Sequence, residues 1–128
     1  MTNWQEHNRR EFEKVYNNFE NIKKELPDFL IQFLKDQANS ILRNTKKRSP
    51  VITGNLRSHW DITDVEISNG NFIIYLINPV KYTSFVEYGT RKSLGRFMAT
   101  VSIKEAEAKM PERFKKRFQN WLKENGIW

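Results

Sequence analysis

The segment of residues 60–78 constrains the fold most, because it has the pattern of a β-hairpin. Before the turn, apolar residues alternate with polar ones at Trp60, Ile62, Val65 and Ile67. A slip in this alternation near Asp64 predicts a β-bulge. Asn69-Gly70 is the strongest short hairpin signal, since both residues tolerate a positive φ. The continuous apolar run 72–77 that follows predicts a strand covered on both faces.

Helices are expected before this hairpin. Residues 8–25 carry one apolar stripe on a helical period, formed by Phe12, Val15, Tyr16, Phe19 and Ile22. Pro27 is expected to interrupt this helix and to open a second one, since proline suits the first helical turn. The second helix is predicted to end near Thr45, before Pro50.

The chain after the hairpin is also predicted to be mainly helical. A short helix should begin near Tyr82 and end at Gly89 as a left-handed C-cap. The alternating residues after Phe97 favour a short extended piece, with a helix beginning at the capping box 102–105. Pro111 is expected to open or to kink a last helix, which Asn125-Gly126 ends.

The predicted elements are thus helices at both ends of the chain with a β-hairpin between them. The 128 residues fit a single domain, 1–128. Residues 1–26 are expected to form a peripheral amphipathic helix, and residues 27–128 the α+β core. The chain has no cysteine, no signal-peptide pattern and no apolar run of about 20 residues that could span a bilayer.

Positive charge is concentrated in two stretches, although the net charge is only +7. Residues 37–60 and 88–104 contain no acid. The bases in them are Arg43, Lys46, Lys47, Arg48, Arg57, Arg91, Lys92, Arg96 and Lys104. Such a concentration attracts anions, nucleic acid among them, or simply keeps the surface soluble. The sequence leaves both interpretations open.

No pattern in the chain indicates catalysis, so we predict no catalytic residue, no metal ligand and no cofactor. The histidines are His7 and His59, without metal-binding, phosphate-loop or nucleophile-elbow spacing around them. Glu87 stands between aromatic residues and could act as a general base in a pocket. An ion pair with Arg57 or Arg91 is the favoured interpretation.

Three short segments together carry more information than any one of them alone. They are Ser49-Pro50-x-x-Thr53-Gly54-Asn55-Leu56-Arg57-Ser58-x-Trp60, Tyr82-x-x-Phe85-Val86-Glu87-Tyr88-Gly89-Thr90-Arg91 and Gly95-Arg96-Phe97-Met98. In this order, and over residues 25–125, the chain resembles the tail-component, or head–tail joining, family of long-tailed phages and prophages. The motif positions are Pro50, Thr53, Gly54, Asn55, Leu56, Glu87, Tyr88, Gly89 and Thr90. Thr53 is expected to cap one helical turn with its hydroxyl.

The resemblance implies an α+β fold, in which a small antiparallel sheet with a β-hairpin packs against N-terminal and C-terminal helices. It also implies a structural virion protein of the neck or tail, with no enzymatic turnover. Copies of the chain, typically six, would form a ring that completes the tail and joins it to the DNA-filled head. Its partners would be itself, neighbouring neck and tail-tube proteins and, transiently, the passing DNA, but no membrane. It would be found in the virion, and in the host cytoplasm during assembly.

The resemblance also makes the basic residues candidates for contacts with the DNA channel or with partner proteins. These are Lys46, Lys47, Arg48, Arg57, Arg91, Lys92 and Arg96. Two alternative functions remain open, a tail terminator of similar fold and a basic nucleic-acid-binding module. An enzyme acting through Glu87 and Arg57 is a third, which nothing in the sequence requires.

Overall fold

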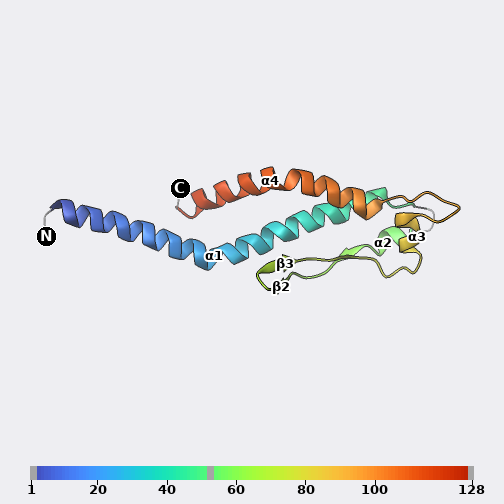
Figure 1. Cartoon of the computed structure of the whole chain (residues 1–128), viewed down its shortest axis with the longest axis horizontal. Coiled ribbons are helices and arrows are strands. Elements are labelled where there is room, and N and C mark those ends of the chain that lie inside the picture. Colours follow the sequence, from blue (N-terminus) through green and yellow to red (C-terminus); the bar gives the residue numbers. More distant parts are fainter. Residues whose placement is uncertain (1–2, 52–53, 127–128) are drawn as a thin grey trace.

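The computed structural model describes residues 3–51 and 54–126 and has two long helices with short strands between them (Figure 1). The helices are α1 (Asn3–Arg48), α2 (Asn55–Ser58), α3 (Thr83–Tyr88) and α4 (Met98–Glu124). The strands are β1 (Asp61–Ile62), β2 (Glu66–Ser68), β3 (Asn71–Ile73) and β4 (Leu76–Ile77). The predicted α+β class is confirmed.

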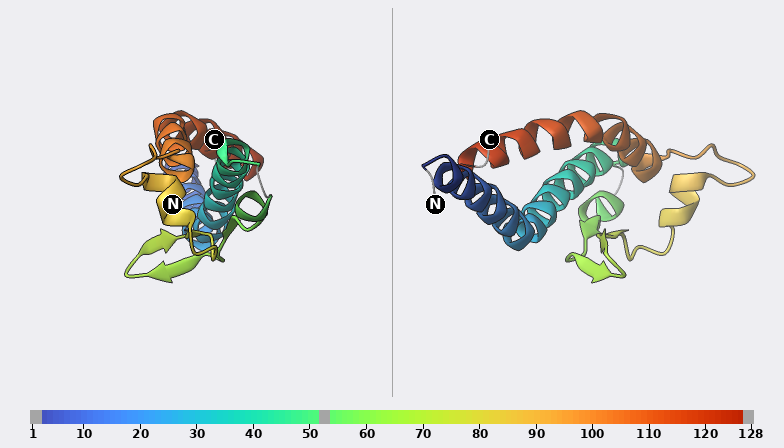
Figure 2. Two further views of the ribbon diagram at one scale, coloured as in Figure 1. Left: turned by 90° about the vertical axis from the view of Figure 1, so that its right-hand side faces the viewer. Right: turned by 60° about the vertical axis from the view of Figure 1, so that its left-hand side comes forward.

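Helix α1 is continuous over 46 residues, so the expectation of two helices separated at Pro27 is wrong. A proline within a helix removes one backbone hydrogen bond, and its ring pushes away the preceding turn. The helix therefore bends at the proline when the residues on both sides of it remain helical. Figures 1 and 2 show this bend between the blue and cyan parts of α1. The bend gives the N-terminal part a direction of its own.

The C-terminal half of α1 packs along α4 through aromatic side chains. Phe29 contacts Trp121 with ring centroids 5.3 Å apart, and Phe33 meets Phe114 edge-on at 5.2 Å. Phe29 and Phe33 are buried. Each such pair contributes about 0.5–1.5 kcal/mol beyond simple burial. This packing explains how the chain remains helical on both sides of the proline.

Helix α4 begins earlier than the sequence indicated and does not stop at Pro111. The predicted extended piece and the predicted capping box at Ser102 are both wrong. Ser102 lies fully buried inside the helix, where its hydroxyl donates to the Met98 carbonyl at 2.7 Å. Packing against α1 outweighs the strand-like alternation in this stretch, because it buries Met98, Ser102 and Ala106 at helical spacing.

The predicted hairpin is confirmed. Strands β2 and β3 pair antiparallel, with Ile67 opposite Phe72. Asn69 and Gly70 have φ values of 51° and 78°, as the predicted Asn-Gly turn requires. Strands β1 and β4 form a second antiparallel pair, and the chain between β1 and β2 interrupts the ladder near the expected bulge.

The apolar run 72–77 is not one strand covered on both faces, which corrects that expectation. It is divided between β3 and β4, and Tyr75 and Ile77 are exposed. A sheet of two strands has one face on the helices, and nothing described covers the other face. The alternate side chains of the run therefore remain in contact with solvent.

A small core joins the end of α1, α2, the strands and the start of α4. Leu56, Trp60 and Met98 are buried in it. The Trp60 indole N–H donates to the Ser49 hydroxyl at 2.8 Å, and that hydroxyl donates to the Thr45 carbonyl at 2.8 Å. Trp60 is thus a core residue. This core brings α2, α3 and the loop before α4 to one end of the molecule (Figure 1).

Candidate assembly surface

The first motif segment forms the turn between the end of α1 and β1. Gly54 stands at the N-cap of α2 with a φ of 68°, and the expected single helical turn follows at Asn55–Ser58. Leu56 is buried, whereas Asn55 is exposed. The cap predicted for Thr53 falls outside the described residues. In this segment the motif therefore supplies two buried apolar anchors, Leu56 and Trp60, and a turn made possible by glycine.

Glu87 binds the start of α4 and forms no ion pair with Arg57 or Arg91 in the described residues, so that expectation is wrong. Its carboxylate oxygens accept from the Ala99 N–H at 2.9 and 3.0 Å and from the Thr100 N–H at 3.2 Å. The N-terminus of a helix has backbone N–H groups without an acceptor in the helix and is the positive end of the helix dipole. A carboxylate accepts from these N–H groups, and its negative charge is stabilised by the dipole. Glu87 is 4% exposed and caps α4 from α3.

Gly89 allows the loop of residues 90–97 to close against α3. Its φ is 88° but its ψ is 176°, so the predicted left-handed C-cap is wrong in ψ. A Cβ at this position would lie 2.6 Å from the Gly95 nitrogen and 2.7 Å from the Ser93 oxygen. The motif glycine is therefore required by its positive φ and by the close backbone approach.

Backbone hydrogen bonds hold both ends of this loop. The Thr90 N–H donates to the Ser93 carbonyl at 2.8 Å, and the Arg96 N–H donates to the Val86 carbonyl at 2.8 Å. At the tip Leu94 is 95% exposed, and Tyr88 at the base is 69% exposed. The loop thus presents apolar side chains to solvent next to Arg91 and Lys92. Sequence reasoning did not single out Leu94, although an apolar residue inside a basic loop is a detectable signal.

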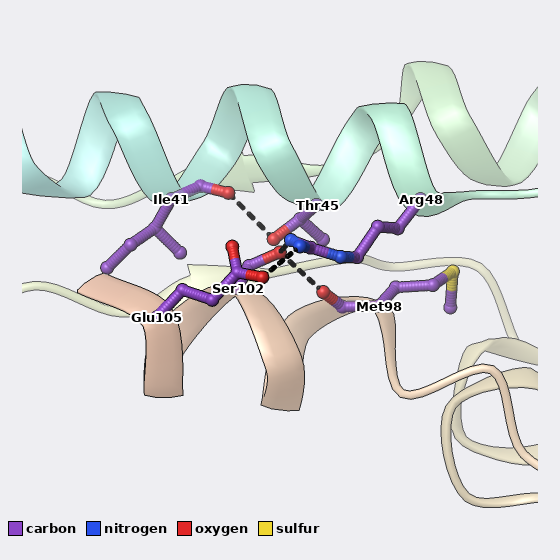
Figure 3. A network of polar contacts seen from close by, with 6 residues as sticks. All are labelled: Ile41, Thr45, Arg48, Met98, Ser102 and Glu105. Carbon is purple, nitrogen blue, oxygen red and sulfur yellow. Dashed lines mark hydrogen bonds and ion pairs between the residues drawn. The ribbon is translucent and has the colours of Figure 1, made fainter. Parts of the chain in front are cut away.

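Arg48 is part of the fold rather than a free surface cation. Figure 3 shows it reaching from the end of α1 to α4. Its guanidinium donates to the Ser102 hydroxyl at 2.7 Å and to the Glu105 carboxylate at 2.6 Å. This residue joins the two long helices, which the sequence did not predict because the partners are 54 and 57 positions away.

Arg57 also has an internal role. Its Nε–H donates to the Lys46 carbonyl at 2.7 Å, and an Nη2–H donates to the Lys47 carbonyl at 3.4 Å. These carbonyls are among the last of α1, where the dipole is negative and partners within the helix are missing. Arg57 therefore caps the C-terminus of α1 and holds α2 beside it.

The other cations predicted as contacts are available at the surface. Lys47, Arg91, Lys92 and Arg96 are exposed, and Lys46 is half-buried. We refer to these five residues as the basic end, because they lie at the end of the molecule where α1 stops and α4 starts. A groove of about 470 Å³ opens nearby, between β4, α3 and the start of α4.

The geometry around this groove does not indicate catalysis. Glu87 lines the groove, but both of its oxygens already accept from the backbone of α4. His59 Nδ1 lies 2.6 Å from the Asn55 carbonyl, so Nδ1 donates there and is not a base toward Ser58. In residues 3–51 and 54–126, no group of three or more His, Cys, Asp and Glu could hold a metal ion.

A protein-family model matches residues 13–89, which is 77 of the 128 residues, counted as 89 − 13 + 1. The family is described as "Bacteriophage HK97-gp10, putative tail-component". The chain belongs to this family. The match includes the first motif segment and the second segment up to Gly89, so it starts earlier and ends earlier than the expected 25–125. No curated protein and no solved structure gives a significant match.

Membership in the HK97 gp10 family makes the protein a phage tail component and places it in the virion, as the motifs predicted. Tail components act with other structural proteins of the phage. Among the described helices, none is both long and apolar enough to cross a membrane.

Proposed function

We propose that the protein forms a ring at the head-proximal end of the phage tail, completes the tail and joins it to the DNA-filled head. One observation carries the proposal beyond family membership. Large apolar side chains are more than 60% exposed at both ends of the molecule: Trp4, Phe12, Phe19, Phe85, Tyr88 and Leu94. A monomeric protein rarely exposes so many, and such sites usually mark interfaces.

A closed ring requires two different surfaces on each subunit, one of which meets the other on the neighbour. Exposed apolar side chains lie in separate parts of the fold, along the N-terminal part of α1 and at the loop before α4 (Figure 1), so the chain offers more than one surface to its neighbours. In the proposal each chain is a single domain, 1–128, with residues 1–26 peripheral. Six copies form the ring, which assembles in the host cytoplasm without cofactor or turnover.

The basic end is proposed to face the DNA channel or an acidic neck protein. Lys46, Lys47, Arg91, Lys92 and Arg96 remain contact candidates, whereas Arg48 and Arg57 are occupied by internal bonds. Contact with passing DNA is expected to be weak, because a channel that gripped DNA would block its passage. Changing the five residues to Ser should therefore impair joining or DNA ejection without unfolding the protein.

Deletion of the gene from its phage tests the main proposal. We expect filled heads and tails of normal length that do not join, and purified protein added to the lysate should restore infectious particles. Overlong tails would instead favour the tail-terminator alternative, because a terminator stops tube growth. Intact, joined virions from the deletion strain would overturn the proposal.

We retain the nucleic-acid-binding module as a second candidate because the basic end carries several exposed cations. The acid among the motif positions, Glu87, is buried and does not offset them at the surface. It predicts tight duplex binding by the free protein, with an affinity that falls steeply with salt. A gel shift at low and moderate salt measures this. Binding that persists at moderate salt would favour the module over the ring.

A further inference from the structure

The N-terminal part of α1 carries an apolar seam that is only partly covered. We call residues 3–26 the arm. Apolar residues alternate at spacings of three and four along α1: Phe12, Val15, Phe19, Ile22, Leu26, Phe29 and Phe33. This is the a/d pattern of a helix that packs along a neighbour over its whole length. The seam therefore requires a packing partner from Phe12 to Phe33.

Helix α4 covers only the C-terminal end of this seam. Phe29 is buried against Trp121 and Phe118, and α4 ends at Glu124. In the arm, Phe12 is 73% exposed and Phe19 is 66% exposed. Figure 1 shows the blue part of α1 extending past the C-terminal end of α4. The same helix face thus continues beyond its intramolecular partner.

The uncovered area is of the size that a stable interface uses. Five large apolar side chains of the arm are at least half exposed: Trp4, Phe12, Val15, Tyr16 and Phe19. Since an aromatic side chain buries about 150–250 Å², covering these five would remove roughly 600 Å² from solvent. A standard interface takes about 800 Å² from each partner. The arm alone can supply most of one side.

The charge of the arm favours a protein partner. It contains five acids and five bases: Glu6, Arg9, Arg10, Glu11, Glu13, Lys14, Glu20, Lys23, Lys24 and Glu25. Helices that lie on anionic membranes have polar faces rich in Lys and Arg, and nucleic-acid surfaces are basic. A balanced polar face with an aromatic seam is typical of helix docking onto protein.

The body of the same chain has an apolar groove that is open to solvent. It lies between α1, the strands and α4, with a volume of about 300 Å³. Its lining is apolar except for Glu107: Leu34, Ala38, Ile41, Ile62, Ile74, Leu76, Ile103, Glu107 and Met110. Leu76 and Ile103 also line the groove of about 470 Å³ beside α3, so the two hollows adjoin.

The arm of a chain does not reach its own groove. Leu34 and Ile41, on the groove wall, belong to the same continuous helix as the arm. Folding the arm back would require breaking α1. Every copy therefore presents an arm with exposed aromatic side chains and an open apolar groove. The arm can dock only in the groove of a second molecule.

We propose that the arm of one copy docks, through Phe12, Val15 and Phe19, in the apolar groove of a neighbouring copy. The contact joins two different surfaces, so it can repeat from subunit to subunit and close a ring. This inference rests on the proposed ring and names the surfaces that build it. The predicted occupant of the groove is a second copy of this chain.

Disulfide cross-linking tests the docking directly, because the chain has no cysteine of its own. Phe19→Cys and Ile74→Cys proteins are prepared separately, mixed in equal amounts at high concentration and oxidised. We expect a mixed dimer as the main product. Asn17→Cys, on the opposite face of the arm, is the matched control and should give at least tenfold less. Equal cross-linking by the control, or mainly Phe19→Cys homodimer, would overturn the proposal.

Assembly measurements separate this inference from the ring itself. Phe12→Ser/Phe19→Ser should weaken self-association at least tenfold by sedimentation, with helicity by circular dichroism unchanged. Arg10→Ser/Asn17→Ser, on the opposite face, should behave as wild type. Rings that form equally well with the aromatic variant would refute arm docking and leave the proposed function intact. A wild-type chain that does not associate, together with cysteine variants that do not cross-link, would refute both. Flotation of the wild-type protein with phosphatidylglycerol vesicles, lost in the aromatic variant, would show a membrane occupant instead.

Discussion

The carboxylate of Glu87 lies 2.9 Å from the backbone nitrogen of Ala99, and this contact fixes the end of α3 against the first turn of α4. The two residues are 12 positions apart, separated by the exposed loop of residues 90–97. The loop that presents Leu94 and the exposed basic residues is therefore positioned by a buried charge. Loss of that charge should affect both stability and assembly.

Glu87→Ala should lower the free energy of unfolding by about 2–3 kcal/mol. The substitution removes charge-assisted hydrogen bonds and leaves buried N–H groups of α4 without an acceptor. Urea denaturation followed by circular dichroism measures the change. Glu112→Ala, which removes an exposed carboxylate on α4, is the control and should change stability by less than about 0.5 kcal/mol. Equal effects of the two substitutions would contradict the capping role.

Gly89→Ala should destabilise the protein more than Gly54→Ala. Both glycines have positive φ, so each substitution costs about 1–2 kcal/mol for the strained backbone. Only at Gly89 would the new Cβ also meet backbone atoms, the Gly95 nitrogen and the Ser93 oxygen. Thermal unfolding of the two variants measures the difference. Identical melting temperatures would show that the loop does not close as tightly as described.

Arg48→Met should reduce stability by about 1–2 kcal/mol, because it removes the hydrogen bonds to Ser102 and Glu105 while keeping the length of the side chain. Lys47→Met is the matched control, since Lys47 is exposed on the same turn. Chemical denaturation should find the control within about 0.5 kcal/mol of wild type. A loss of DNA binding by Arg48→Met without a loss of stability would contradict the structural role.

Pro27→Ala should straighten α1 and raise its stability. An exposed proline inside a helix costs up to about 3 kcal/mol relative to alanine, and the bend relieves part of this. We expect a higher melting temperature together with weaker assembly, since the arm would change direction. Pro111→Ala in α4 should raise the melting temperature without affecting assembly. Unchanged sedimentation of Pro27→Ala would show that the direction of the arm has no role.

Local signals predicted local structure well. Asn69-Gly70 was enough to place the hairpin turn, because the φ values of these two residues limit the turn type. The short helix predicted between Tyr82 and Gly89 is found at Thr83–Tyr88, and Asn125-Gly126 follows the end of the last helix, both as local patterns indicated. The ordered motifs also identified the family, since they carry its turns and its buried anchors.

Proline was the main source of error in the helices. Pro27 was expected to separate two helices, yet it lies inside a continuous helix, as Pro111 does. The cost of a proline is a few kcal/mol, and the aromatic contacts between α1 and α4 together exceed it. That balance depends on residues about 80 to 90 positions apart, such as Phe29 and Trp121. Local patterns do not contain it.

The sequence by itself determined the fold class, the hairpin and the family, because these follow from turn residues and apolar spacing within short stretches. Only the tertiary structure decided the roles of the charged residues. The sequence indicated surface contacts for Arg48 and Arg57 and an ion pair for Glu87. In the structure, each of the three binds a helix end or a partner helix within the fold. The physical reason is that helix ends expose unpaired backbone groups, and which side chain reaches them depends on how distant segments pack.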